Sequence, residues 1–125
     1  MRILFVLLFS FYLNSVNGQD KEHQRYLDNG DAAKLSSFFS KKVDLKVPNS
    51  KGIYSKKQAE LVMADFFDDN LALKYNVKHY GGSKAKAKFE IGELVNKEKK
   101  YRTYLLYQTN DSSLQIIELR IEPED

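Results

Sequence analysis

Cysteine is absent from the 125-residue chain, and its absence excludes several kinds of chemistry. No disulfide can stabilise the protein, and thiol catalysis, zinc–thiolate sites and iron–sulfur clusters are excluded as well. A lipid-anchored lipoprotein is also excluded, because no cysteine follows the apolar segment near the N-terminus. We therefore expect the fold to be stabilised by packing alone.

Long apolar runs are equally scarce, and the clearest one extends only from Ile3 to Leu13. A membrane-spanning helix needs ~20 residues, so this run is too short. It follows a basic residue and precedes a short polar segment, which is the pattern of a secretory signal peptide. We predict a signal peptide over residues 1–18, cleavage before Gln19, and a single domain over residues 19–125 that is exported to the periplasm or the extracellular space. A retained membrane anchor is the alternative, but after cleavage we expect no stable membrane insertion.

The net charge is small. Without residues 1–18, which include Arg2, 19 basic and 17 acidic side chains remain, a balance of +2. Such a mild charge does not predict nucleic-acid binding. The sequence has no metal-binding spacing around His23 or His79, no phosphate-binding glycine loop and no G-x-S-x-G motif. We therefore expect no metal, no cofactor and no nucleic-acid partner.

The strongest local pattern begins at Ser55. Ser55 and Gln58 have the spacing of a capping box, in which each side chain satisfies a free backbone N–H of the other. Apolar residues then recur at the spacing of one helical face: Ala59, Val62, Met63, Phe66 and Phe67. We predict a long helix over residues 55–70 that packs on a sheet. The acidic residues near its end are either a patch for a cation or partner, or a solvated helix end: Asp65, Asp68 and Asp69.

The rest of the chain divides into short elements. We predict a short helix over residues 19–29, a strand at 43–47 and a turn at 48–52. Between them lies a second helix, capped by Asp31, whose apolar face is Leu35, Phe38 and Phe39. Four more strands are predicted at roughly 73–80, 85–95, 101–109 and 114–122. The fold class is α+β, with two short helices and one long helix packed on a curved antiparallel meander sheet, a cone that is open at one end.

Strand registers can be predicted because residues that face each other across a strand pair share one side of the sheet. A three-residue loop at 81–83 and a five-residue loop at 96–100 keep the apolar residues on one side. These loops give the pairs Tyr75–Phe89, His79–Ala85 and Ile91–Leu105. The pairs Leu105–Leu119, Tyr107–Ile117 and Thr103–Ile121 extend the inner face to the last strand.

On this register the inner side of the sheet has apolar walls with a few polar groups, which is typical of a small-ligand pocket. The candidate lining residues are Tyr75, His79, Glu93, Thr103 and Tyr107. Histidine is the side chain that titrates near neutral pH, so His79 is the candidate for proton transfer.

A series of short motifs covers essentially all of residues 19–125: Asn29-Gly30-Asp31, Phe38-Phe39-Ser40, Val43-Asp44-Leu45, Tyr54 to Glu60, Phe66-Phe67, His79-Tyr80-Gly81, Phe89 to Gly92, Tyr101-Arg102 and Ile117 to Ile121. In this order they resemble the nuclear-transport-factor-2-like superfamily, and more narrowly the exported bacterial domain-of-unknown-function family 4783. The resemblance implies the cone fold. It implies no activity, because none is assigned to that family, and the superfamily includes isomerases, dehydratases, cyclases, transport factors and non-catalytic binding domains.

Superfamily isomerases and dehydratases place an aspartate or glutamate in the pocket, alone or with a histidine. Here the inner positions offer only Glu93, which lies well along the strand from His79. We therefore predict an exported, non-catalytic domain that binds a small ligand or a partner protein in the cell envelope. The alternative is a small isomerase or lyase that uses His79.

The outer side of the predicted sheet has two features. One is a basic surface, which is either a stripe for an acidic partner or a solvated face that prevents edge-to-edge association: Lys74, Lys78, Lys84, Lys86 and Lys88. The other is the apolar cluster Tyr104, Leu106 and Ile116, framed by Glu90, Arg102, Glu118 and Arg120. An apolar cluster with a charged rim is typical of a protein–protein contact, so we predict a homodimer through this surface.

Overall fold

The computed structural model of the chain describes residues 22–82, 87–110 and 113–124. Along this part of the chain lie three helices and six strands: α2 (Glu22–Asn29), α3 (Ala32–Ser36), β1 (Phe39–Val47), β2 (Ser50–Ser55), α4 (Lys56–Asp69), β3 (Lys74–Gly82), β4 (Lys88–Val95), β5 (Lys100–Asn110) and β6 (Ser113–Pro123). The predicted signal peptide and its cleavage position fall outside the described residues.

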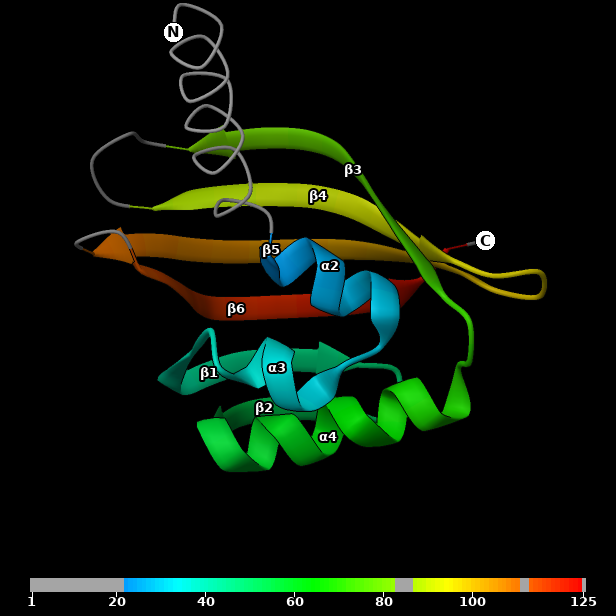
Figure 1. Ribbon diagram of the computed structural model, residues 1–125, viewed down its shortest axis with the longest axis horizontal. Helices are drawn as coiled ribbons and strands as arrows, with labels where there is room; N and C mark the ends of the chain where they lie inside the picture. The colour runs from blue at the N-terminus through cyan, green and yellow to red at the C-terminus, as the bar shows by residue number, and fades with distance from the viewer. Residues whose placement is uncertain (1–21, 83–86, 111–112, 125) are drawn as a thin grey trace, which may run out of the picture.

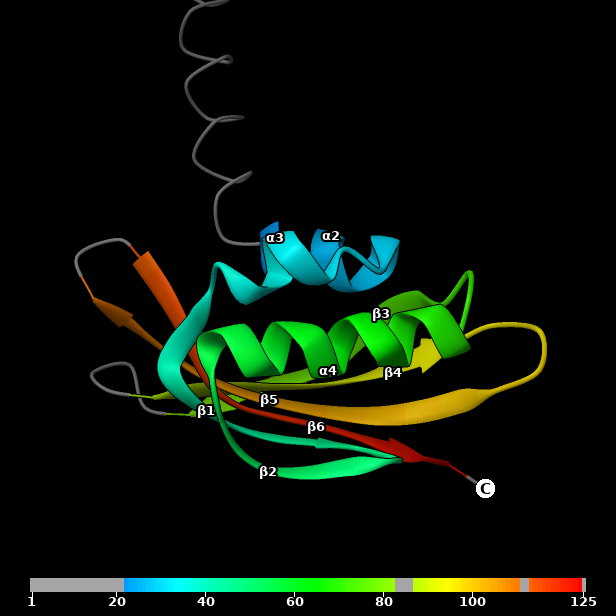
Figure 2. The ribbon, with the colours of Figure 1, turned by 90° about the horizontal axis from the view of Figure 1, so that it is seen from below.

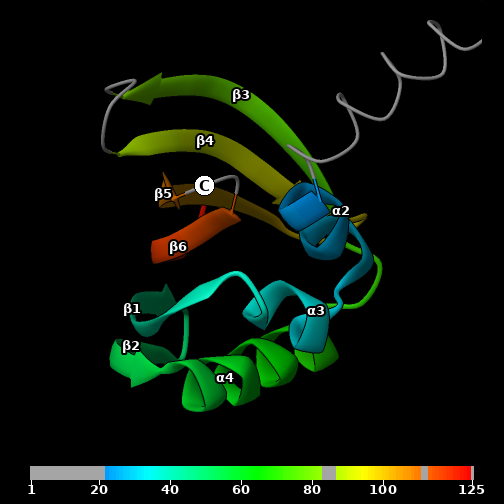
Figure 3. The same cartoon turned by 60° about the vertical axis from the view of Figure 1, so that its left-hand side comes forward.

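The six strands form one curved sheet in the order β2-β1-β6-β5-β4-β3. β1 runs parallel to β6, and all other neighbouring strands are antiparallel. The three helices lie on one side of the sheet, with α4 alongside β1 and β2 (Figures 1 and 2). The sheet curves toward that side (Figure 3). The predicted α+β fold, with two short helices and one long helix on a curved sheet, is confirmed, although the sheet is mixed rather than purely antiparallel.

The strand β2 is not predicted by the sequence pattern, which indicates a turn at 48–52. Val47 pairs with Ser50, so only Pro48-Asn49 forms the turn. The positions of β2 alternate between half-buried and exposed, and its one aliphatic side chain, Ile53, is 72% exposed. The apolar alternation that marks a strand is therefore weak in this segment.

The predicted helix caps are confirmed. Ser55 Oγ accepts a hydrogen bond from the Gln58 N–H, and Gln58 Oε1 accepts one from the Ser55 N–H, both at 3.2 Å. Asp31 caps α3 by accepting from the Lys34 N–H at 3.0 Å. The helix α3 is shorter than predicted, however, and Phe39 is the first residue of β1 rather than part of a helical face.

A shift of one residue between β4 and β5 turns β4 over. Ile91 pairs with Tyr104 and Glu90 pairs with Leu105, where the sequence predicts Ile91 opposite Leu105. Because side chains alternate along a strand, the shift exchanges the two sides of β4. Glu90, Gly92 and Leu94 are buried, whereas Phe89, Ile91 and Glu93 are only half-buried.

The register of β3 against β4 differs from the predicted one by more than a single residue. Tyr75 pairs with Leu94 instead of Phe89, and His79 pairs with Ile91 instead of Ala85. A β-bulge between Val77 and His79 adds one residue to β3 and places His79 opposite an outward-facing residue.

A second bulge, between β5 and β6, pairs Tyr107 with Ile116 rather than with Ile117. The pairs Leu105–Leu119 and Thr103–Ile121 are as predicted.

Candidate functional site

The structure brings together three of the five residues predicted to line an inner pocket. Tyr75, Thr103 and Tyr107 are buried on the inner side of the sheet. His79 is exposed, because the bulge in β3 turns it outward, and its predicted inward position is wrong. Glu93 also lies outside, because β4 is turned over, and it forms ion pairs with Lys78 at 3.6 Å and Lys100 at 3.9 Å.

Glu90 faces inward, on the side of β4 where the predicted register places its neighbours Phe89 and Ile91. It is fully buried, and its Oε1 atom lies 2.8 Å from Nε2 of His23, which is itself only 2% exposed. The Tyr75 hydroxyl donates to Oε2 of Glu90 at 2.6 Å. Gln24 donates to Oε1 of Glu90 at 3.3 Å and to the Tyr80 hydroxyl at 2.9 Å. Side chains from α2, β3 and β4 thus form one hydrogen-bonded network around Glu90.

Gly92 makes room for this network. A Cβ atom at Gly92 would lie 2.6 Å from the Asn76 carbonyl oxygen and 2.8 Å from the Tyr75 ring. Because Gly92 has no side chain, the Tyr75 ring can pass over β4 at this point. Its hydroxyl then reaches Glu90, two residues along the same side of the strand.

The network fixes the charge states of Glu90 and Tyr75. Burial acts to raise the pKa of Glu90, but the hydrogen bond and charge of His23 and the hydrogen bonds from Tyr75 and Gln24 outweigh it, so the pKa is lowered. Burial, and then the charge of Glu90, raise the pKa of Tyr75 far above its usual value. Glu90 is therefore a carboxylate and Tyr75 a proton donor at neutral pH. Both Glu90 oxygens already accept hydrogen bonds from neighbouring side chains, and the network holds α2 against the sheet.

The sequence interpretation missed both His23 and Glu90. The sequence pattern bears on His23 only as a metal ligand, and it places Glu90 on the outer side, at the rim of the predicted dimer surface. The signal that would have found Glu90 is the run Phe89-Glu90-Ile91-Gly92, in which the inward side can be either the apolar pair or the Glu–Gly pair. Only the one-residue register of β4 decides between them.

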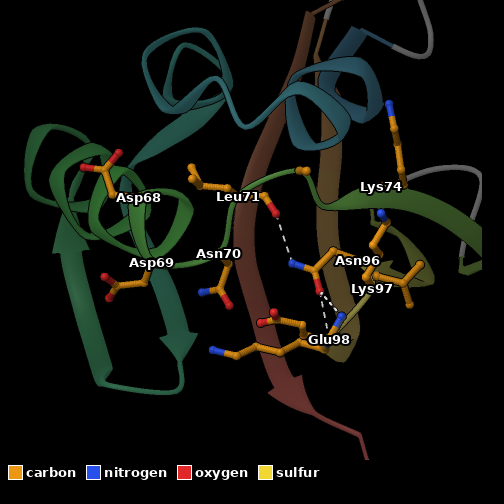
Figure 4. A pocket seen from close by; sticks show the side chains of 11 residues that line it. Asp68, Asp69, Asn70, Leu71, Lys74, Asn96, Lys97 and Glu98 are labelled. Atoms are coloured by element: carbon orange, nitrogen blue, oxygen red, sulfur yellow. Dashed lines mark hydrogen bonds between the residues drawn. The ribbon is translucent and has the colours of Figure 1, made fainter.

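An open hollow of about 720 Å³ lies at one end of the sheet, between the C-terminal end of α4 and the β4–β5 loop (Figure 4). Its apolar lining residues are Leu71, Ala72 and Val95. Three acidic and three basic side chains line it: Asp68, Asp69, Glu98, Lys74, Lys97 and Lys99. The volume is within the usual range of small-ligand pockets, about 300–1,000 Å³. We refer to it below as the end hollow.

Hydrogen bonds hold the two rims of the end hollow together. Asn96 Nδ2 donates to the Leu71 carbonyl oxygen at 3.0 Å, which joins the α4–β3 loop to the β4–β5 loop. Asn96 Oδ1 accepts from the backbone N–H groups of Glu98 and Lys99, at 2.9 and 2.8 Å. Ala72 adopts a positive φ of 59°, which is uncommon for a residue other than glycine. The loop conformation is therefore well defined.

A second hollow of about 750 Å³ shares Asp68, Asp69, Asn70 and Lys99 with the end hollow. Asn70 lines both hollows, and two hydrogen bonds hold its side chain. Its Nδ2 donates to the Phe66 carbonyl at 2.9 Å, and its Oδ1 accepts from the Tyr101 hydroxyl at 2.7 Å. The two hollows thus adjoin along the C-terminal end of α4.

The predicted basic surface is partly neutralised. Lys74, Lys78 and Lys88 are exposed, as expected, whereas Lys84 and Lys86 lie outside the described residues. The predicted Tyr75–Phe89 register would place Asn76 opposite Lys88, but Asn76 pairs with Glu93. Lys74 lies 3.8 Å from Asp28, and Lys78 is paired with Glu93.

The predicted dimer surface keeps most of its residues. Tyr104 and Leu106 are half-buried on the outer side, where Phe89 stacks on Tyr104 with 5.9 Å between ring centroids. Arg102 and Arg120 are exposed, and Arg120 forms an ion pair with Glu118. Ile116 does not belong to this surface: the bulge in β6 turns it inward, and it is fully buried.

Within residues 22–82, 87–110 and 113–124, no group of three or more histidine, aspartate or glutamate side chains is placed to hold a metal ion. In the same part of the chain, no helix has the length and apolar character needed to cross a membrane.

Comparison with known proteins supports the resemblance seen in the sequence. The profile of a family described as a domain of unknown function, DUF4783, matches residues 21–122. A DUF4783 family protein from Bacteroides uniformis is 28% identical and superposes with a TM-score of 0.70, over 80% of this chain and 92% of its own. A second, from Bacteroides ovatus, is 22% identical with a TM-score of 0.71, over 81% and 91%.

More distant structures share the fold alone. An NTF-2-like protein of unknown function from Silicibacter pomeroyi is 10% identical, with a TM-score of 0.60 over 93% of this chain and 98% of its own. The sequence predictions of family and fold are therefore confirmed. Comparison with curated proteins gives no match.

Proposed function

The chain belongs to the DUF4783 family of domains of unknown function, and we propose that it is an exported, non-catalytic domain that binds a small ligand in the end hollow. The observation that carries the proposal is the end hollow itself, a solvent-open space of ligand size lined by apolar and charged side chains. Its rims are joined through Asn96, so the site exists before a ligand arrives.

Catalysis is less well supported than binding. A general acid or base must reach the proton that it transfers. His23 and Glu90 are 2% and 0% exposed and already bind each other. His79 is exposed on the outer side, and none of the described residues gives it a hydrogen bond or an ion pair. His79 therefore does not lie in a pocket where it could act on a substrate, as the isomerase or lyase alternative requires.

The proposed export rests on the N-terminal sequence. Mass spectrometry of the protein recovered after expression of the full-length sequence in a bacterial host is the test. We expect an N-terminus at Gln19. Membrane-associated protein that retains residues 1–18 would contradict the proposal.

The exposed leucine in the end hollow is positioned to contact a bound ligand. We expect compounds that stabilise the wild-type protein in a thermal-shift screen of small metabolites to lose that effect in the Leu71→Ser variant. Leu71 is 73% exposed, so its replacement removes ligand contact without disturbing the core. The matched control is Leu61→Ser, on α4, where the side chain is 58% exposed and lines none of the hollows described above. Hits that persist in Leu71→Ser, or a screen without hits, would count against binding in the end hollow.

A second candidate function is self-association through the outer side of the sheet. There Phe89 pairs with Leu106 and Ile91 with Tyr104, and all four side chains are half-buried in the single chain. Charged residues at the edge of this apolar group, including Arg102 and Arg120, are exposed. An apolar centre with a charged rim favours a homodimer.

We expect the wild-type protein to sediment as a dimer at high micromolar concentration and Tyr104→Arg to sediment as a monomer. An arginine at the centre of the proposed interface would be buried without a partner in the dimer. Leu61→Arg, on the helical side, is the control and should leave the dimer intact. A wild-type protein that is only monomeric at these concentrations rules the dimer out.

A further inference from the structure

The two walls of the end hollow carry opposite charges. One wall is the C-terminal end of α4, where Asp68 and Asp69 are exposed. The last turn of α4 has no basic residue, and a helix C-terminus itself carries partial negative charge. Among the described residues, neither aspartate has an ion-pair partner. This wall therefore carries uncompensated negative charge.

The opposite wall is the β4–β5 loop and the start of β3. Lys97 and Lys99 are exposed and form no ion pair with any residue that the structure describes. Lys74 also lines this wall, but it is paired with Asp28. Glu98 contributes a single carboxylate against the two unpaired ammonium groups of Lys97 and Lys99, so this wall is positive overall. In the close view of the hollow, Asp68 and Asp69 lie on one side and Lys74 and Lys97 on the other (Figure 4).

An apolar side chain lies between the two walls. Leu71 is 73% exposed, and Figure 4 shows it between the aspartates and the lysines. Its carbonyl is fixed by Asn96, and the next residue, Ala72, has the unfavourable φ of 59°. Backbone conformations of this kind are disfavoured for L-residues, and they persist where the surrounding structure holds them. The fold thus keeps an apolar contact surface in the middle of a charge-separated hollow.

We propose that the end hollow binds a zwitterion with an apolar side chain, namely a free α-amino acid or a short peptide with free ends. The ammonium group lies toward Asp68 and Asp69, the carboxylate toward Lys97 and Lys99, and the apolar side chain against Leu71. A simple cation or a simple anion would be repelled by one of the two walls, whereas a dipolar ligand is attracted by both. This assignment rests on the proposed function, that the end hollow is a small-ligand site.

Isothermal titration of the protein produced from the full-length sequence tests the assignment. The probes are leucine, leucyl-leucine, and N-acetyl-leucyl-leucine amide, in which both charges are removed but the apolar groups remain. We expect at least one zwitterion to bind and the capped peptide to bind at least about fivefold more weakly. The zwitterion that binds more tightly shows which of the two lengths spans the walls. Binding should weaken at high salt, because exposed charges are screened.

Single-charge variants provide the second arm. Asp69→Asn and Lys97→Gln should each weaken zwitterion binding about two- to fivefold, the range expected for an exposed ionic contact. The matched controls Asp44→Asn and Lys51→Gln remove exposed charges on β1 and β2, outside the hollow, and should leave the affinity unchanged.

The possible negative results distinguish a failure of the zwitterion assignment from a failure of the proposed function. If the capped peptide binds as tightly as the zwitterions, or if Asp69→Asn behaves like Asp44→Asn, the zwitterion assignment is overturned while the end hollow remains a binding site. If neither leucine nor leucyl-leucine binds but other compounds stabilise the protein in a Leu71-dependent way, the assignment is again overturned and the proposed function stands. If no compound binds at all, both are overturned.

Discussion

Replacing Glu90 with alanine is expected to destabilise the protein by about 3–5 kcal/mol, the usual result of removing one member of a buried ionic network. The change leaves His23 and Tyr75 in the core without their shared acceptor. Urea unfolding at pH 7 measures the loss. Glu124→Ala, at an exposed position near the end of β6, is the control and should have an effect within about 0.5 kcal/mol. Similar stability of the two variants would mean that the network does not hold α2 to the sheet.

The same network predicts the pH dependence of stability. The pKa of Glu90 is lowered in the folded protein, so its carboxylate stabilises the fold above the carboxyl pKa of the unfolded chain, about 4.3. That contribution is lost as the pH falls through the lowered folded-state value. The stability difference between wild type and Glu90→Gln should therefore be largest near neutral pH and shrink below about pH 4. A difference that does not change between pH 7 and pH 3 would contradict the assigned charge state.

Gly92→Ala should have the second-largest effect, a loss of about 1–3 kcal/mol, which is typical of overpacking in a core. The new Cβ would lie 2.6 Å from the Asn76 carbonyl oxygen, a backbone atom of the neighbouring strand that cannot move away freely. It would also press on the Tyr75 ring at 2.8 Å and so disturb the bond to Glu90.

The control for Gly92→Ala is Gly52→Ala in β2. There the nearest atom to a new Cβ is a ring atom of Tyr54, at the ordinary contact distance of 3.4 Å. Thermal unfolding of both variants, compared with wild type, measures the effect. If the two alanine variants unfold at the same temperature, the close passage of Tyr75 over Gly92 is not important for the fold.

The sequence predicted the fold well because its helix signals are local. The capping box at Ser55 and the cap at Asp31 depend on residues three apart, so no long-range contact is needed to find them. The apolar face of α4 is similarly visible in the spacing of Met63, Phe66 and Phe67.

The site was harder to predict because it depends on strand register, which is a long-range property. A shift of one residue between β4 and β5 places Glu90 instead of Glu93 on the inner side, and one bulge in β3 turns His79 outward. The sequence around Val77 has no local pattern that predicts a bulge. Each side of β4 also has residues that could face the core. The end hollow was missed for a related reason: its walls come from 68–74 and 95–99, segments brought together only by the fold.

The most direct test of ligand binding in the end hollow is a two-dimensional ¹H–¹⁵N NMR titration of the protein with leucyl-leucine. We predict that backbone amide shifts change for residues 70–74 and 95–99, on the two sides of the Asn96–Leu71 hydrogen bond. The amide chemical shifts of residues around His79 and Glu90 should not change. Changes that are largest around His79 or the inner side of the sheet would contradict binding in the end hollow. No change at saturation with either leucyl-leucine or leucine would contradict the zwitterion assignment.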